Sequence, residues 1–267
     1  MKRFAFIISL LPFIFLGLWL VAIPESLLKD LIAGSFNNSN VYLETEGFKK
    51  GLFYNFSIQK IFLKKKGDVI SGEALAVFES VDGRLNIMSI LKLRPELDFD
   101  CIMNHGEVSG AVQLMHNSNL KIKGSRIHTR GIPFLELLGI RGDGNLALSL
   151  WLNDGKGEIK FSVDEMDFQS TSLGVVYLPL DVFRKMRGLM LLENETLDIK
   201  SLALEGKGIY ARVKGSIKEG MANLAMELMP DSSFESGNLF RIMLEKYRVS
   251  PGFYLIPIRS SLFNEST

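Results

Sequence analysis

The chain opens with an apolar run, and the rest alternates between apolar and polar positions. Residues 4–23 contain no charge. At a rise of 1.5 Å per helical residue, such a run spans about 30 Å, the thickness of a bilayer's hydrocarbon core. We expect a transmembrane anchor over 4–23. Lys2 and Arg3 precede it, so the positive-inside rule makes 1–3 a cytoplasmic tip and places 24–267 on the other side.

A cleaved secretory signal is the alternative for this segment. Such signals have a shorter apolar region, about 7–15 residues, and end in a site with two small residues. Ala22 lacks a small partner because Leu20 stands two places earlier, and Pro24 and Glu25 follow directly. The sequence favours the uncleaved anchor.

Beyond residue 24, apolar positions recur with a period of two, which is typical of half-buried β-strands. The clearest runs are 97–103, 146–152, 159–168, 209–213 and 222–228. Within 159–168 the phase slips, and a bulge between Asp164 and Glu165 would restore it. Turn signals at 104–106, 141–144, 153–155 and 205–208 separate the runs. The pattern predicts a mainly β fold with an antiparallel sheet, one face apolar and the other polar.

Helices are expected to be few and short. The candidates are 24–32, 88–93, 133–138 with Gly139 as its C-cap, 180–186 between Pro179 and Gly188, and 239–247. The residues 253–258 predict a last strand. No change of composition divides 24–267, so we expect one β-rich domain.

Charge and cysteine content narrow the function. The chain has 31 basic and 30 acidic residues, without the basic excess of a nucleic-acid-binding surface. The Lys64–Lys66 run is either a solvated strand end or a contact for anionic headgroups. Cys101 is the single cysteine, so an internal disulfide is impossible.

The search for catalytic chemistry gives weak candidates. A hairpin could bring His105 and His116 together, but these residues and His128 lack metal-ligand spacing. Cys101 lies among alternating apolar residues, which favours a core position over a nucleophile. Asp98 and Asp100 share the polar face of one strand, the usual place of solvated carboxylates.

Two further motifs have plain interpretations. The glycine-rich 139–144 precedes a strand, so it predicts a turn and not a phosphate loop. The sequons at Asn37 and Asn194 matter only in a eukaryotic secretory pathway. We therefore assign no catalytic, cofactor-binding or metal-binding residue and expect a non-enzymatic protein without a cofactor.

Several stretches resemble a known family. They are EGFKKGLFY (46–54), PFLELLG (133–139), LPLDVFRKMRG (178–188), LALEGKGIYARVKGSI (202–217), LMPDSS (228–233) and LEKYRVSPGFYLIPI (244–258). Together with the anchor, they are similar to protein N of the bacterial type II secretion system, in its single-span form. The layout also resembles the wider AsmA-like group.

The resemblance implies a location and a fold. The chain would be a single-pass inner-membrane protein with its C-terminal domain in the periplasm. The sheet would be curved, an AsmA-like groove or a partly open barrel with an apolar concave face. The motifs are structural, so the resemblance carries no active-site residue.

Two functions follow as hypotheses. The first is a scaffold or accessory subunit that contacts other secretion-system subunits. The second is a lipid-binding or lipid-transfer protein that holds acyl chains in the sheet groove. In both, the N-terminal helix contacts membrane lipids. The two hypotheses differ in whether the apolar face of the sheet is covered as a core or stays open as a groove.

Overall fold

The computed structural model describes residues 17, 19, 24–36, 41–66, 74–114, 119–137, 139–173, 176–234 and 244–261. The fold is mainly β and antiparallel, with few short helices, as the periodicity predicts. The chain separates into two compact units. Unit 1 is Met1–Met103 with Val108–Asn119, and unit 2 is Asn104–Glu107 with Leu120–Thr267.

Unit 1 contains the strands β1-β3-β4-β5 and most of β6, the first part of one 15-stranded sheet. The bounds are β1 Val41–Glu46, β2 Lys49–Lys50, β3 Asn55–Lys65, β4 Ala74–Leu85, β5 Glu96–Met103 and β6 Gly106–Gln113. The short strand β2 pairs with β3 outside this path. The core includes Phe56, Ile58, Val81, Leu97 and Cys101, all at most 6% exposed.

Two helices belong to unit 1. The helix α2 (Glu25–Phe36) buries Leu28 and Ile32, which lie four residues apart on one face. The helix α3 (Ile87–Leu91) begins at Asn86, whose Oδ1 accepts from the backbone N–H groups of Met88 and Ser89. This cap satisfies donors that the first helical turn leaves unpaired.

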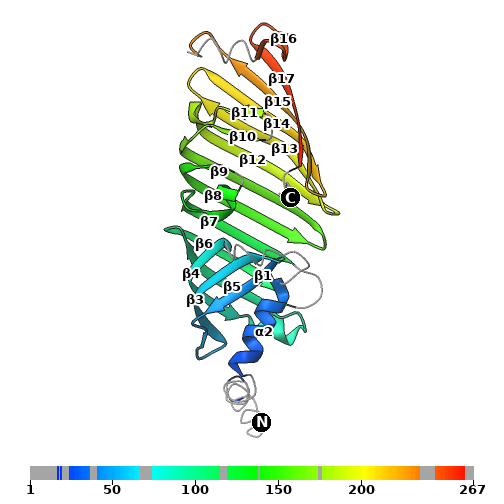
Figure 1. Cartoon of the computed structure of the whole chain (residues 1–267). Helices are drawn as coiled ribbons and strands as arrows, with labels where there is room; N and C mark the ends of the chain where they lie inside the picture. Colours follow the sequence, from blue (N-terminus) through cyan, green and yellow to red (C-terminus); the bar gives the residue numbers. More distant parts are fainter. Residues whose placement is uncertain are drawn as a thin grey trace, which may run out of the picture. The chain divides into compact units, whose positions relative to one another are not determined.

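Unit 2 contains the longer part of this sheet, in the order β7-β8-β9-β12-β13-β14-β15-β17-β16, and these strands lie side by side nearly in chain order (Figure 1). The bounds are β7 Leu120–His128, β8 Gly142–Asn153, β9 Lys156–Phe168, β12 Phe183–Glu193, β13 Thr196–Gly206, β14 Ile209–Lys218, β15 Met221–Pro230, β16 Arg248–Ser250 and β17 Phe253–Ser261. A separate pair, β10 (Thr171–Leu173) and β11 (Val176–Leu178), lies between β9 and the 3-10 turn η2 (Leu180–Val182). The predicted last strand is confirmed as β17.

The short helix α4 (Pro133–Leu137) confirms the predicted helix and its glycine cap. Gly139 has a φ of 72°, and its N–H bonds to the Glu136 carbonyl. The next N–H, that of Ile140, bonds to the Leu135 carbonyl. This pair of bonds is a Schellman motif, which needs the left-handed conformation that glycine adopts without cost.

Bulges keep the apolar positions on one face of the sheet. The register slips by one residue in β4, β7 and β9, and the extra residues include Ser80, Arg126 and Glu165, each with a positive φ. In β9 the slip moves Met166 and Phe168 to the buried side, 1% and 4% exposed. The bulge predicted after Asp164 is confirmed.

Two expectations are wrong. The predicted helix over 180–186 is η2 followed by the start of β12, because Phe183 to Glu193 pairs with both β9 and β13. The predicted turn over 141–144 is also too long. Gly142, Asp143 and Gly144 already belong to β8, where they face the bulge of β9.

Other expectations fall largely outside the described residues. Of the anchor 4–23, only Gly17 and Trp19 are described, and of the helix 239–247, only the last four residues. Within the part of the chain that is described, no helix has both the length and the apolar character needed to cross a bilayer.

Candidate functional site

The register of unit 2 places apolar side chains opposite one another from strand to strand. Leu146 of β8 faces Val163 of β9, and Val163 faces Met186 of β12. The row continues through Leu204 and Ala211. Three further rows run parallel to it, one for each step of two residues along the strands.

We call the apolar side of these rows the apolar face. It comprises Leu146, Leu148, Leu150 and Leu152 of β8; Ile159, Phe161 and Val163 of β9; Met186, Met190 and Leu192 of β12; Leu197, Ile199, Leu202 and Leu204 of β13; Ala211, Val213 and Ile217 of β14; Ala222, Leu224, Met226 and Leu228 of β15; and Ile256 and Ile258 of β17. None of these side chains carries a polar atom that can ionise or donate a hydrogen bond.

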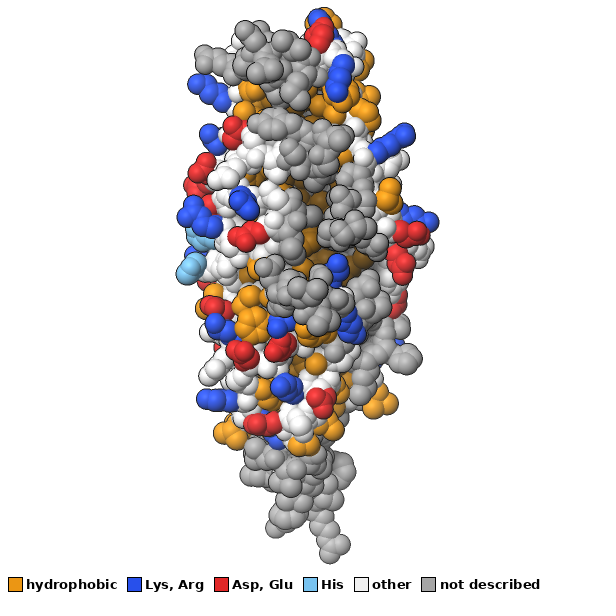
Figure 2. Space-filling model, in the orientation of Figure 1, with side chains coloured by type: hydrophobic (Ala, Val, Ile, Leu, Met, Phe, Trp, Pro, Cys, Tyr) orange, Lys and Arg blue, Asp and Glu red, His pale blue; other side chains and the backbone are white. Residues whose placement is uncertain are grey.

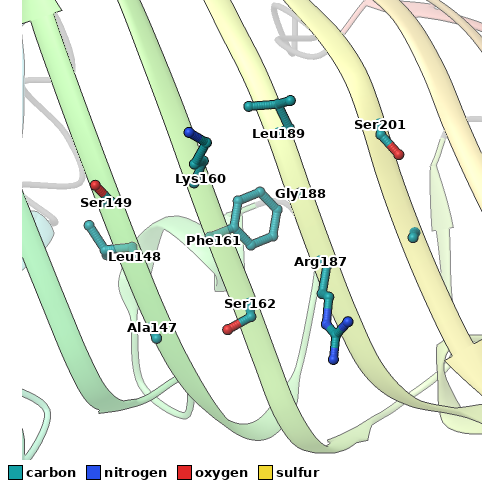
Figure 3. Close-up of a pocket in the computed structure, with 11 residues that line it drawn as sticks. Ala147, Leu148, Ser149, Lys160, Phe161, Ser162, Arg187, Gly188, Leu189 and Ser201 are labelled. Carbon is teal, nitrogen blue, oxygen red and sulfur yellow. The ribbon is translucent and has the colours of Figure 1, made fainter.

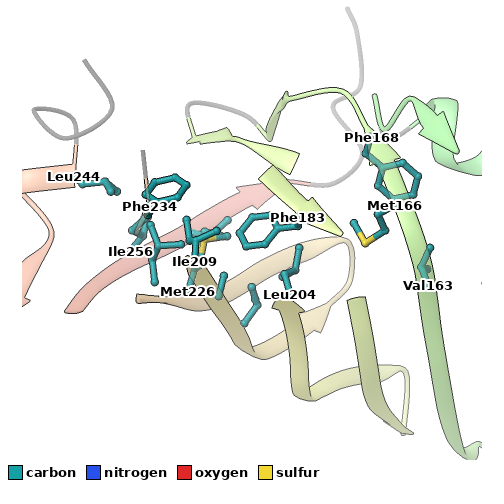
Figure 4. Packing of buried hydrophobic residues seen from close by; sticks show 14 residues of the cluster. Val163, Met166, Phe168, Phe183, Leu204, Ile209, Met226, Phe234, Leu244 and Ile256 are labelled. Atoms are coloured by element: carbon teal, nitrogen blue, oxygen red, sulfur yellow. The ribbon is translucent and has the colours of Figure 1, made fainter. Parts of the chain in front are cut away.

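One end of the apolar face is a closed core. Leu204, Ala211 and Leu228 are at most 5% exposed. They belong to a buried cluster in which Phe234 and Leu244, from the segment between β15 and β16, lie near Ile256 and Ile209 (Figure 4). Leu180 and Val182 of η2 pack against the same cluster. This part of the face therefore supplies stability.

Toward the other end, across β8, β9, β12 and β13, much of the apolar face is only partly buried. The partly buried side chains are Leu148, Leu150, Leu152, Ile159, Phe161, Met190, Leu192, Leu197 and Leu202. Phe161 and Leu202 pack against the buried cluster, and the others lie farther along the rows. Figure 2 shows hydrophobic side chains within a hollowed part of the surface. A contiguous apolar surface of this kind is typical of a ligand-binding or interaction site.

Glycines let ring and leucine side chains lie flat on the apolar face. A Cβ on Gly188 would meet the Phe161 ring at 2.1 Å, and one on Gly157 would meet Leu152 at 2.3 Å. Phe161 and Gly188 are direct cross-strand partners. The ring covers the backbone that the glycine leaves bare, as in aromatic rescue.

A shallow hollow of about 550 Å³ lies over the same strands and is lined mostly by residues of the polar face. Small side chains form much of its lining, together with the longer Lys160, Arg187 and Leu189, and Leu148, Phe161 and Gly188 of the apolar rows also take part (Figure 3). The small ones are Ala147, Ser149, Ser162, Ser201 and Ala203. Lys160 pairs with Glu158 at 2.6 Å. On the same face of β8, Trp151 is 42% exposed.

The histidines meet in a pairing that the sequence did not indicate. His105 lies against His128, with ring centroids 6.2 Å apart, whereas His116 lies outside the described residues. His128 Nδ1 is 3.4 Å from Asp143 Oδ1. No cluster of three or more His, Cys, Asp or Glu ligands occurs among the described side chains.

Asp143 holds this corner of unit 2 together. Partial burial opposes its ionisation, but hydrogen bonds from the Gly144 and Arg130 N–H groups and from His128 lower the pKa of the carboxyl. Asn104 Nδ2 donates to the carbonyls of His128 and Arg130. These contacts connect the Asn104–His105 turn to the end of β7, a structural task.

The remaining candidates take their ordinary structural places. Cys101 is buried, and burial raises the pKa of its thiol to about 12, which disfavours a nucleophilic thiolate. Asp98 faces Arg84 across the strands, and Asp100 faces Asp82, with both Asp98 and Asp100 exposed. Lys64 forms an ion pair with Glu44 of β1.

The glycine-rich stretch and the sequon at Asn194 also have structural places in the fold. Gly139 ends α4 and Gly142 begins β8, so 139–144 forms no phosphate loop. Asn194 and Glu195 form the turn between β12 and β13, with φ values of 48° and 64°. The sequon at Asn37 lies outside the described residues.

Sequence reasoning missed the contribution of β12 to the apolar face. Met186, Met190 and Leu192 alternate as a strand requires, but Pro179 and Gly188 suggested helix ends. The alternation from Met186 to Leu192 is the signal that identifies the strand. No protein-family model matches the chain, and neither a curated protein nor a solved structure is significantly similar to it.

Proposed function

We propose that this chain is a non-enzymatic, membrane-anchored β-sheet protein that binds acyl chains on the apolar face of unit 2. The observation that supports the proposal is the incomplete burial of this face across β8, β9, β12 and β13. The resemblance to AsmA-like proteins agrees with it. The anchor over 4–23 and the charges of Lys2 and Arg3 favour a single-pass inner-membrane protein with its sheet in the periplasm.

The dimensions and energetics suit a lipid tail. Four rows, two residues apart, extend roughly 20 Å along the strands. Each methylene transferred from water to an apolar surface contributes about 0.8 kcal/mol. Covering only part of one acyl chain therefore offsets the entropy lost on binding. The side chains of the apolar face have no group that would recognise a headgroup, so the contact selects tails.

A photocrosslinking experiment tests this proposal in the full chain. Benzoylphenylalanine replaces Leu150 on the apolar face or, as a matched control, the neighbouring Trp151 on the polar face. In cells grown with radioactive phosphate, we expect a phospholipid adduct at position 150 and none at 151. Absence of lipid adducts at 150, or equal adducts at both positions, would contradict the proposal.

A second candidate is a scaffold or accessory subunit of the type II secretion system. Besides the resemblance, the polar face favours it. The hollow lined by small side chains lies on the same face as the exposed Trp151, and tryptophan is enriched at protein-interface hot spots. Loss of secreted cargo or of secretin assembly on deletion of the gene would support this role. Unchanged levels of both would exclude it.

Complementation of the deletion with variants of each face distinguishes the two proposed functions. Complementation of the deletion with Trp151→Ala should fail if the polar face binds a partner subunit. Complementation with Leu150→Gln and Ile159→Gln should fail if the lipid contact is required. These substitutions lie on opposite faces of the same strands.

A further inference from the structure

The hairpin between β2 and β3 ends in an unusual tip, which we define as Gly51–Tyr54. The Gly51 N–H bonds to the Asn55 carbonyl, and the Asn55 N–H bonds to the Leu52 carbonyl. The two central residues, Phe53 and Tyr54, have φ values of 54° and 65°. Tight turns with two positive φ values normally contain Asn and Gly, so two aromatic residues here oppose the local preference.

The two aromatic residues point to different surroundings. Tyr54 is buried, 7% exposed, whereas Phe53 is 66% exposed and the preceding Leu52 is 57% exposed. The turn therefore presents two large apolar side chains at its end. Features that oppose local preference concentrate at functional sites.

The tip is fastened to the end of the apolar N-terminal run. Trp19 Nε1 donates to the Gly51 carbonyl at 2.8 Å. The Trp19 ring lies 4.8 Å from the Tyr54 ring, centroid to centroid, and Trp19 is fully buried. Lys50 Nζ lies 5.1 Å above the Trp19 ring.

This contact fixes the level of the tip relative to the run. Trp19 precedes Ile23, the last residue of the run, by four positions, which corresponds to about 6 Å in a helix. If 4–23 spans the membrane, the tip lies beside the last apolar turn and not out in solution. Tryptophan itself prefers this interfacial level.

We infer that Leu52 and Phe53 insert into the outer boundary of the bilayer that the anchor crosses. The inference rests on the proposed anchor. The molecules that Leu52 and Phe53 would contact are phospholipids. The exposed Lys49 and the Lys50 ammonium lie next to the tip, where phosphate groups of the headgroups would be. An apolar end flanked by cations matches the polarity gradient of a membrane interface.

Depth-dependent quenching tests the inference on the full chain. An environment-sensitive fluorophore is attached at Leu52→Cys or Phe53→Cys, with Met221→Cys as the control. Met221 is 58% exposed and belongs to unit 2. The buried Cys101 has a thiol pKa raised to about 12, so it resists labelling while the protein is folded, and its labelling reports misfolded variants.

The labelled protein is reconstituted in vesicles of phosphatidylethanolamine and phosphatidylglycerol that carry spin-labelled acyl chains. We expect blue-shifted emission and at least a threefold stronger quenching at positions 52 and 53 than at 221. Equal quenching at all three positions would overturn the inference. A blue shift without quenching would also overturn it, in favour of a protein contact.

Alkaline extraction separates this test from the test of the anchor. If the chain resists extraction but its tip labels are not quenched, the anchor stands and the tip inference falls. If alkali extracts the chain from the membrane, the quenching measurement is repeated with the extracted protein mixed with the same vesicles. Quenching at 52 and 53 then supports the tip as a peripheral contact, and its absence rejects it.

Discussion

At the scale of single residues, the contact between Gly188 and Phe161 decides whether β9 and β12 can lie flat together. A methyl group at position 188 would collide with the ring at 2.1 Å. We expect Gly188→Ala to destabilise the protein by about 1–3 kcal/mol through overpacking. Thermal unfolding of the full chain measures the effect.

The matched control is Gly34→Ala in α2, where a Cβ meets no atom within 4 Å. In a Phe161→Ala background, the cost of Gly188→Ala should shrink, because the ring that it strikes is gone. An equal cost in both backgrounds would show that the ring is not the cause.

Cys101 gives a second prediction at this scale. Burial raises the pKa of its thiol to about 12 from a reference of 9.0, so very little thiolate exists near pH 9 in the folded protein. We expect alkylation by iodoacetamide to be at least about a hundredfold slower in the folded than in the urea-unfolded chain. Mass spectrometry follows the reaction. Similar rates in both states would place the thiol at the surface.

At the scale of elements, the bulge in β9 controls which side chains reach the core. Inserting one alanine between Glu165 and Met166 would shift the alternation by one residue and turn Met166 and Phe168 toward the polar face. Each such side chain contributes about 1.5–3 kcal/mol when buried. We therefore expect the insertion to lower the melting temperature strongly or to prevent folding.

The substitution Glu165→Gly serves as its control. It keeps the bulge and suits the φ of 56°, although it loses the hydrogen bond from Asn145. Its melting temperature should stay near that of the unaltered chain. An insertion variant as stable as this control would show that β9 tolerates either register.

The same elements show how far sequence reasoning reaches. The slip at Asp164 was visible because Met166 and Phe168 resume the alternation within one strand, which is local information. Strand β12 was misassigned because Gly188 resembles a helix end. Glycine stands at position 188 because the Phe161 ring of the neighbouring strand lies over it. Such a contact between strands is not visible in the local sequence pattern. The tip at Phe53 was missed for the converse reason, since its sequence lacks the usual turn residues.

At the scale of the whole molecule, the two units differ in their expected response to lipid. The apolar face belongs to unit 2, so a bound acyl chain should stabilise β8, β9, β12 and β13. A ligand present at one hundred times its dissociation constant adds about 2.7 kcal/mol to the state that binds it. Backbone amides that exchange only when the bound region opens should then exchange roughly a hundredfold more slowly, because the opening costs this additional free energy.

Hydrogen exchange with mass spectrometry, with and without added phospholipid, measures this difference. Peptides of β3, β4 and β5 in unit 1 serve as the internal reference and should change little. Peptides of β15 and β17 should change less than those of β8 and β9, because Leu228 and Ile258 are buried without a ligand. Equal protection in both units would point to a general effect of the lipid on the chain and not to a site on the apolar face.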